Sequence, residues 1–270
     1  NLRNGLYTVT DDIIIPSGVY IHGETSEGVI LDFVDNTHGI KATGDNVYTT
    51  GTVSINPGDT TVTGSGTEWL TYAAAGQYIL LGQSWSLITE VVSDTELTIE
   101  LPFGWEIISS GTYTIASIVQ AIEFKNATIL NADNAIDFEY AYNFTISGVT
   151  TSLCNKGIYL NTVSSYDLLN NYNLYNGISV DITNAHLMKG ENVYSLGAQV
   201  SHGIQIDTIE NSKIDNCVSA GNYSDGVHVT NSKNFVLNGT LIQNGNDAIY
   251  MEGCSEIVFD NTATESNIAN

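Results

Sequence analysis

Residues 203–229 decide the fold, and they read GIQIDTIENSKIDNCVSAGNYSDGVHV. The stretch opens with Gly203-Ile204-Gln205-Ile206 and returns, 23 residues later, to Gly226-Val227-His228-Val229. The same pattern, a Gly or Ala followed by alternating apolar and polar residues, begins at 135, 157, 177 and 248. Alternation with a period of two is typical of β-strands. Steps of 20 to 26 residues between these strands make the pattern an internal repeat.

A second series of residues repeats at similar intervals, each one an Asn or Gly after another short strand. Its members are Asn126, Gly148, Asn171, Gly190, Asn216, Gly239 and Asn261. Asn and Gly enter the left-handed backbone region cheaply, so we expect one such bend in every coil. A coil of about 22 residues buries its apolar face only by stacking on others. The repeats predict an all-β, right-handed parallel β-helix rather than leucine-rich repeats, since L-x-x-L-x-L and helical segments are missing.

The composition changes abruptly inside the chain. Of 28 Asn residues, five lie at or before residue 56, none between 57 and 125, and 23 from 126 onward. We therefore expect first β-helix coils in 1–49, an inserted small antiparallel β-barrel or sandwich in 50–116, and the main coils in 117–270. All three Trp fall in the insert, and we expect Trp69, Trp85 and Trp105 to form its core rather than a carbohydrate platform.

Charge and length exclude several classes of function. The 270 residues hold 30 acidic and 7 basic side chains, giving a net charge of -23. No basic patch is available for nucleic acid, and no apolar run is long enough for membrane insertion. Three Cys give neither a disulfide framework nor a paired metal spacing. Because the chain begins at Asn1 without Met, we expect a processed product or a fragment.

Two parts of the chain resemble known proteins. Residues 13–31 (IIIPSGVYIHGETSEGVIL) resemble the opening coils of pectate-lyase-like β-helix proteins, which include bacteriophage tailspikes. Residues 51–70 (GTVSINPGDTTVTGSGTEWL), 88–103 (ITEVVSDTELTIELPF) and 111–115 (GTYTI) resemble a small β module of phage tail proteins. This resemblance implies a homotrimer that recognises, and often cleaves, a host surface polysaccharide. No catalytic motif of the family transfers to residues of this chain.

Alternate side chains of a strand face outward, so the repeat predicts a polar stripe on one face of the β-helix. We expect Tyr and His rings to stack on sugars there, and carboxylates and amides to bind sugar hydroxyls. The expected substrate-binding residues are Asp137, Glu139, Tyr159, Asn161, Gln205, Tyr250 and Glu252.

The expected catalytic residues are Asp181, Asp207 and His228. The repeat places Asp181 and Asp207 at the same position of consecutive coils, with backbones about 4.8 Å apart. Stacked carboxylates repel and raise one pKa, and a retaining glycosidase needs one acid and one carboxylate about 5–5.5 Å apart. A solvated solenoid surface explains the same acids without any chemistry. His228 with Tyr159 or Tyr250 also suits the base and acid of a lyase or epimerase.

We expect no resident metal or cofactor, with Ca²⁺ as the one alternative. Asp137, Glu139 and Glu123 form an acidic cluster of oxygen ligands, which Ca²⁺ prefers, although the spacing of a calcium loop is missing.

Three functions remain open. The first is a phage tailspike or tail-fibre protein, located in the virion tail or outside the cell. It forms a homotrimer, contacts other tail proteins, and binds and depolymerises a host surface glycan. The second is a non-catalytic structural or adhesive β-helix. The third is a secreted bacterial polysaccharide lyase, hydrolase or epimerase.

Overall fold

The computed structural model describes residues 1–82, 84–104, 107–260 and 262–265. The chain divides into two compact units, one formed by Asn1–Ala42 with Gln120–Asn270 and the other by Thr43–Val119. The first is a parallel β-solenoid with a repeat of roughly 22 residues, and the second is an antiparallel sheet. The expected all-β fold class, a parallel β-helix with an antiparallel module, is therefore confirmed. Within the described residues, no helix has the length and apolar character needed to cross a membrane.

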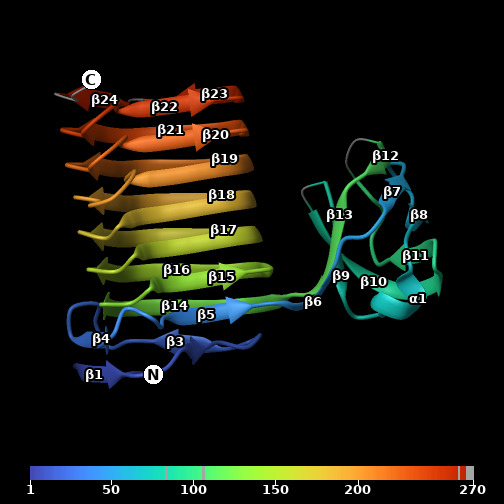
Figure 1. The fold of residues 1–270 in the computed structure, drawn as a ribbon, viewed down its shortest axis with the longest axis horizontal. Helices are drawn as coiled ribbons and strands as arrows, with labels where there is room; N and C mark the ends of the chain where they lie inside the picture. Colours follow the sequence, from blue (N-terminus) through green and yellow to red (C-terminus); the bar gives the residue numbers. More distant parts are fainter. Residues whose placement is uncertain (83, 105–106, 261, 266–270) are drawn as a thin grey trace. The chain divides into compact units, whose positions relative to one another are not determined.

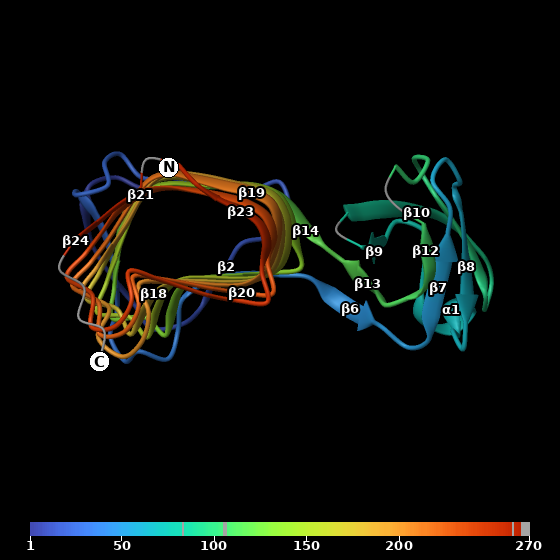
Figure 2. The same ribbon diagram turned by 90° about the horizontal axis from the view of Figure 1, so that it is seen from above.

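The solenoid strands stack one coil upon the next, each parallel to its neighbour (Figures 1 and 2). Its first strands are β1 (Gly5–Val9), β2 (Ile13–Ile14), β3 (Tyr20–His22), β4 (Val29–Phe33) and β5 (Ile40–Thr43). After the second unit the coils continue with β14 (Val119–Leu130), β15 (Asn134–Glu139), β16 (Ala141–Ser152), β17 (Lys156–Leu174) and β18 (Ile178–Leu196). The last are β19 (Ile204–Ala220), β20 (Val227–Thr230), β21 (Lys233–Ile242), β22 (Ile249–Glu252), β23 (Ser255–Phe259) and β24 (Ala263–Glu265).

The core of the solenoid is a stack of inward apolar side chains, one above another. Ile136 pairs in register with Ile158, which pairs with Val180, and the series continues through Ile204 to Val227. These five side chains are at most 1 % exposed. Each contributes roughly 1.5–3 kcal/mol by burial, and stacking makes that burial continuous along the solenoid.

Each coil bends at corners where a single residue has a positive φ. One corner runs through Asn126, Gly148, Asn170, Asn192 and Asn216. The expected series is thus wrong at three positions, at two of which the bend is displaced: it falls on Asn170 and Asn192 instead of Asn171 and Gly190. Gly239 is not among the residues with positive φ, and Asn261 lies outside the described residues. Asn171 instead points inward, fully buried, and its amide donates to the carbonyl of Ile146.

A ladder of buried amides lines another corner and explains the repeated Gly before each strand. Asn176 accepts from the backbone N–H of Cys154, and two coils later Asn222 accepts from that of Ala198. Asn244 continues the ladder by accepting from the side chain of Asn222. A Cβ on Gly226 would lie 2.6 Å from Asn244 Nδ2 and 2.7 Å from the carbonyl oxygen of Ala248. Only Gly therefore fits where this strand begins beside the ladder.

The second unit is an eight-stranded antiparallel sheet with one short helix. In chain order it contains β6 (Asp45–Tyr48), β7 (Thr52–Ile55), β8 (Thr61–Ser65), α1 (Trp69–Tyr72), β9 (Tyr78–Leu81), β10 (Ser84–Ser93), β11 (Glu96–Ile99), β12 (Ile108–Gly111) and β13 (Tyr113–Ser117). Trp69 is fully buried in the core cluster of this unit, which confirms the role expected for it. Trp85 is 7 % exposed and is not part of that cluster. Trp105 lies outside the described residues.

His186 is expected to make the solenoid acid-sensitive. Burial lowers the pKa of this imidazole from 6.5 to about 4, and its side chain is only 5 % exposed. Above pH 6.5 the ring is neutral in both the folded and the unfolded chain. As the pH falls from 6.5 to 4 the unfolded chain takes up a proton that the folded chain excludes, which lowers the free energy of unfolding by about 3 kcal/mol.

The measurement is urea unfolding at pH 7 and pH 4 for the wild type and for His186→Gln. We expect the variant to lose about 3 kcal/mol less between these pH values. Ser212→Ala, which removes a buried side chain that does not titrate, serves as the control and keeps the wild-type pH dependence. Equal pH dependence in all three proteins contradicts the prediction.

Candidate functional site

The ten residues expected to form a site lie on two neighbouring columns of one strand face. The first, the Tyr250 column, consists of in-register residues on β15, β17, β18, β19, β20 and β22, namely Asp137, Tyr159, Asp181, Gln205, His228 and Tyr250. The second, the Glu252 column, consists of Glu139, Asn161, Thr183, Asp207, Thr230 and Glu252. The structure thus brings the expected residues to one surface while leaving their roles in binding or catalysis as predictions.

The expected pairing of Asp181 with Asp207 is wrong. Asp181 pairs in register with Gln205, and Asp207 pairs with Thr183, so the two acids belong to different columns. Asp181 is 6 % exposed and its carboxylate lies 2.7 Å from Lys156 Nζ. Asp207 accepts hydrogen bonds from the Thr230 hydroxyl at 2.6 Å and from the Asn231 amide at 2.9 Å. Each carboxylate is held separately, so the stacked acid pair of a retaining glycosidase does not form.

Lys156, Asp181 and Tyr159 instead form a compact cluster at the middle of the Tyr250 column. Lys156 Nζ lies 4.0 Å from the centroid of the Tyr159 ring as well as beside Asp181. Burial raises the pKa of Tyr159 to about 12, with further contributions from Glu139 and Asp181. Burial also raises the pKa of Asp137, against a hydrogen bond from Asn134. Lys156 therefore links the coil that carries Tyr159 to the next coil, which carries Asp181.

Glu123 does not join Asp137 and Glu139 as expected for a calcium site. It lies on β14, in register with Tyr20 of β3, whereas Asp137 is in register with Tyr159. The Glu123 carboxylate contacts Lys125 and the His22 ring, and the Lys125 hydrogen bond is the main cause of its lowered pKa. Glu139 accepts from the Asn161 amide at 3.3 Å. Glu123 therefore belongs to a different pair of strands from Asp137 and Glu139.

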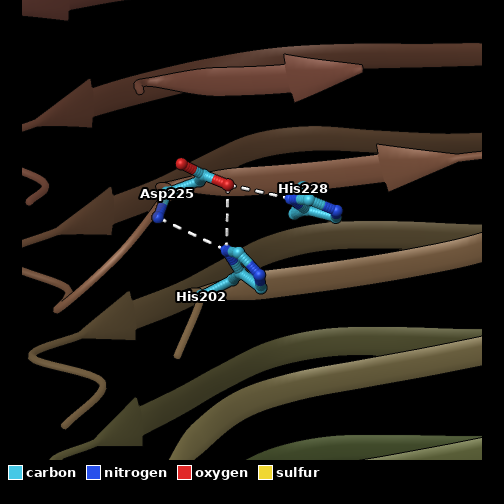
Figure 3. Close-up of side chains that lie close together, drawn as sticks. All are labelled: His202, Asp225 and His228. Carbon is cyan, nitrogen blue, oxygen red and sulfur yellow. Dashed lines mark hydrogen bonds and ion pairs between the residues drawn. The ribbon is translucent and has the colours of Figure 1, made fainter. Parts of the chain in front are cut away.

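The most distinctive group of side chains is His202, Asp225 and His228 (Figure 3). Asp225 Oδ2 lies 3.0 Å from Nδ1 of His202 and 2.8 Å from Nδ1 of His228. Asp225 is 4 % exposed, and its other oxygen, Oδ1, accepts the backbone N–H of Asp247 at 3.2 Å. Burial lowers the pKa of His202, with the neighbouring His228 adding to the shift. A buried carboxylate thus holds two imidazoles with their Nδ1 atoms directed at one point.

Three rings stack beside this carboxylate. The ring centroids of His202 and His228 are 4.1 Å apart, and those of His228 and Tyr250 are 4.6 Å apart. The Tyr250 hydroxyl donates to Glu252 Oε2 at 3.0 Å, which fixes the ring. An open hollow of about 360 Å³ lies against the stack, lined by His202, Ser224, Asp225, His228, Asn246, Asp247 and Tyr250. Rings, carboxylates, an amide and a hydroxyl therefore border one accessible space.

Sequence reasoning identified His228 and Tyr250 but missed the other residues of the hollow. His202, Asp225 and Asp247 each stand immediately before the Gly or Ala that opens a strand. That position forms a third outward column at the edge of the strand face. The signal was present in the repeat, because two acids and an imidazole occupy it in three consecutive coils.

Comparison with solved structures finds similarity to phage tailspikes and to an alginate epimerase, with TM-scores below 0.5. The Gp54 tailspike of Acinetobacter baumannii bacteriophage AP22, solved with A. baumannii capsular saccharide, is 9% identical, with a TM-score of 0.46; 92% of this chain and 52% of that chain are covered. Tailspike gp49 of Pseudomonas phage LKA1 is 11% identical, with a TM-score of 0.48; 97% of this chain and 54% of that chain are covered. The periplasmic alginate epimerase AlgG is 12% identical, with a TM-score of 0.44; 95% of this chain and 57% of that chain are covered.

The chain spans about half the length of these three solved structures. A search of curated proteins found no match. Residues 89–268, more than half of the chain, match the family described as periplasmic copper-binding protein (NosD), and the chain therefore belongs to that family.

Proposed function

We propose that this chain binds a polysaccharide at the hollow beside the His202–His228–Tyr250 ring stack, outside the cytoplasm. The observation that carries the proposal is the stack itself, in which ring faces repeat at 4.1 and 4.6 Å next to carboxylates and an amide. Because the stacked rings cover one another's inner faces, the exposed ring of Tyr250 supplies the apolar contact with a sugar ring, while carboxylate, amide and hydroxyl groups hydrogen-bond sugar hydroxyls. The outward columns extend this polar surface along the solenoid.

The charge of the protein narrows the class of glycan. With a net charge of -23, the chain repels a strongly anionic polymer unless cations bridge the two. Asp225 and Asp247 place further negative charge at the hollow. A neutral or weakly charged polysaccharide is therefore the proposed ligand.

The specific form of the proposal is a phage tailspike or tail-fibre protein that recognises a host surface glycan. This form includes a homotrimer located in the virion tail, in contact with other tail proteins. One alternative is a structural or adhesive β-helix that binds the same glycan without cleaving it. The other is a secreted lyase, hydrolase or epimerase that acts chemically on a polysaccharide. Light scattering at micromolar concentration separates these forms, because a monomeric mass contradicts the tail protein.

Tyr250→Ala is expected to weaken glycan binding about tenfold. The ring is 37 % exposed and its loss removes one face of the stack, where burial of roughly 50 Å² of apolar surface is worth about 1.3 kcal/mol. The measurement is retention of the protein on immobilised envelope polysaccharides from bacteria, with the dissociation constant obtained from titration of the retained material.

Tyr172→Ala is the matched control. Tyr172 is also an exposed ring, 42 % exposed and stacked on Tyr194 at 4.5 Å, but it does not line the hollow. Its loss leaves binding unchanged if the proposal is correct. Equal weakening by both substitutions, or no retention of the wild type on any glycan, contradicts the proposal. Release of reducing ends from the same material would add catalysis to the binding function.

The family description names copper, and the residues of this chain meet its chemical requirements. Among the described residues, His202, Asp225 and His228 bring two imidazole nitrogens and one carboxylate oxygen within 4.8 Å of one another. Imidazole nitrogen is a preferred ligand of Cu²⁺ and of Zn²⁺, and carboxylate oxygen also binds Zn²⁺. Copper bound there would supply a strong positive charge beside the hollow.

A further inference from the structure

We propose that Nδ1 of His202, Nδ1 of His228 and Oδ2 of Asp225 bind one divalent transition metal ion, Cu²⁺ or Zn²⁺. The three residues come from two successive coils: His202 precedes β19, Asp225 precedes β20, and His228 lies in β20. This proposal is independent of glycan binding, because it rests on the three donor atoms alone.

The distances between the donor atoms suit a common metal ion. Two donors that each lie about 2.05 Å from a metal, at an angle between 90° and 109°, are roughly 2.9–3.3 Å apart. Asp225 Oδ2 lies 3.0 Å from His202 Nδ1 and 2.8 Å from His228 Nδ1. The third pair, Nδ1 of His202 and Nδ1 of His228, lies within 4.8 Å, and rotation of the two imidazoles toward each other brings all three atoms around one ion.

Both imidazoles already turn the same nitrogen toward the same carboxylate oxygen. In the metal-free protein Nδ1 of His228 contacts the Asp225 carboxylate, whereas Nδ1 of His202 also accepts the backbone N–H of Asp225 at 3.4 Å; a metal ion takes the place of these hydrogen bonds when it binds. The ring centroids are 4.1 Å apart, so each ring restricts the rotation of the other. The arrangement lowers the conformational entropy that metal binding costs.

The surroundings of Asp225 hold the carboxylate in place. Its side chain is 4 % exposed, and its Oδ1 atom accepts the backbone N–H of Asp247. Such a second hydrogen bond orients a ligating carboxylate and is a regular feature of metal sites. The hollow in front of the group supplies access and space for water or another ligand at the open coordination positions.

Metal titration of the full chain tests the site. Protein without a polyhistidine tag is stripped with a chelator and titrated with Cu²⁺, Zn²⁺ and Ca²⁺ by calorimetry, and the bound metal is measured by elemental analysis. We expect one Cu²⁺ or Zn²⁺ per chain and no saturable Ca²⁺ binding, because Ca²⁺ prefers oxygen ligands. The electron paramagnetic resonance spectrum of the Cu²⁺ complex is expected to show hyperfine splitting from two imidazole nitrogens.

His202→Ala and His228→Ala are each expected to lower metal affinity by more than about 100-fold. Loss of a group that only supports a ligand already costs 10–100-fold, and these residues are ligands themselves. His22→Ala is the matched control, since it removes another imidazole that contacts a carboxylate, that of Glu123. Circular dichroism of each variant verifies that the solenoid remains folded.

The control is expected to bind metal as the wild type does. Absence of a 1:1 complex in the wild type overturns the proposal, as does unchanged affinity in a folded variant lacking both His202 and His228. These titrations contain no glycan, so their failure leaves the glycan proposal intact, and failure of glycan retention leaves the metal site intact.

Discussion

Replacement of Asn222 by Ala is expected to lower the free energy of unfolding by about 3–5 kcal/mol. The Asn222 side chain is 3 % exposed and joins three coils. Its Oδ1 atom accepts from the backbone N–H of Ala198 at 2.8 Å and from the Ser195 hydroxyl at 3.3 Å. Its Nδ2 atom donates to Ser219 Oγ at 2.9 Å and to Asn244 Oδ1 at 2.8 Å.

The large effect follows from the groups that the substitution leaves behind. The buried N–H of Ala198 loses its side-chain acceptor, and Asn244 loses one donor. Each unsatisfied buried polar group costs about 1–3 kcal/mol, and the vacated volume adds a cavity term. Urea unfolding followed by far-ultraviolet circular dichroism measures the change.

Asn155→Ala is the control for this prediction. Asn155 also bridges two coils, since its amide donates to Asp133 Oδ1 at 2.7 Å, but it is exposed to solvent. Water replaces that hydrogen bond, so we expect a loss below about 1 kcal/mol. Similar losses at positions 222 and 155 would show that burial of the ladder is not what stabilises the coils.

Trp69→Ala is expected to destabilise the second unit by about 3–5 kcal/mol. The indole is fully buried in the core of that unit, and its N–H donates to the Tyr113 hydroxyl at 3.0 Å. The Tyr113 ring meets it edge to face, with centroids 5.8 Å apart, and the Tyr113 hydroxyl donates to the carbonyl of Thr50. Burial also raises the pKa of Tyr113 well above its usual value.

The measurement compares Trp69→Ala and Leu70→Ala by thermal and urea unfolding. Leu70 is the next residue of α1 and is 61 % exposed, so its truncation is expected to change stability by less than about 0.5 kcal/mol. Tryptophan fluorescence follows the unfolding of this unit, because all three Trp of the chain lie within it. A Trp69 variant as stable as the Leu70 variant contradicts the proposed role of the indole as the centre of this core.

The sequence alone does not determine how the strand near residue 180 pairs with its two neighbouring coils, and the failed site prediction follows from this. The repeat pattern aligns Gly177-Ile178-Ser179-Val180 with the strands that begin at 157 and 203. In the structure, Val180 occupies the place of Ile158, and Ser179 is buried. A shift by two residues preserves the alternation of inward and outward side chains, so the pattern of residues cannot detect it. Hydrogen bonding between neighbouring coils selects the register, and it moved Asp181 out of the column of Asp207.

By itself, the sequence determined the all-β class, the repeat of roughly 22 residues and the strand face that carries Tyr159, Gln205 and Tyr250. These properties depend on local alternation and on Gly and Asn that recur from one coil to the next, and both can be read along the chain. Only the tertiary structure placed His202 beside Asp225 and His228, residues 23 and 26 positions away in the chain. Their meeting depends on how consecutive coils align across the strand edge, and that alignment arises from packing and hydrogen bonds between coils.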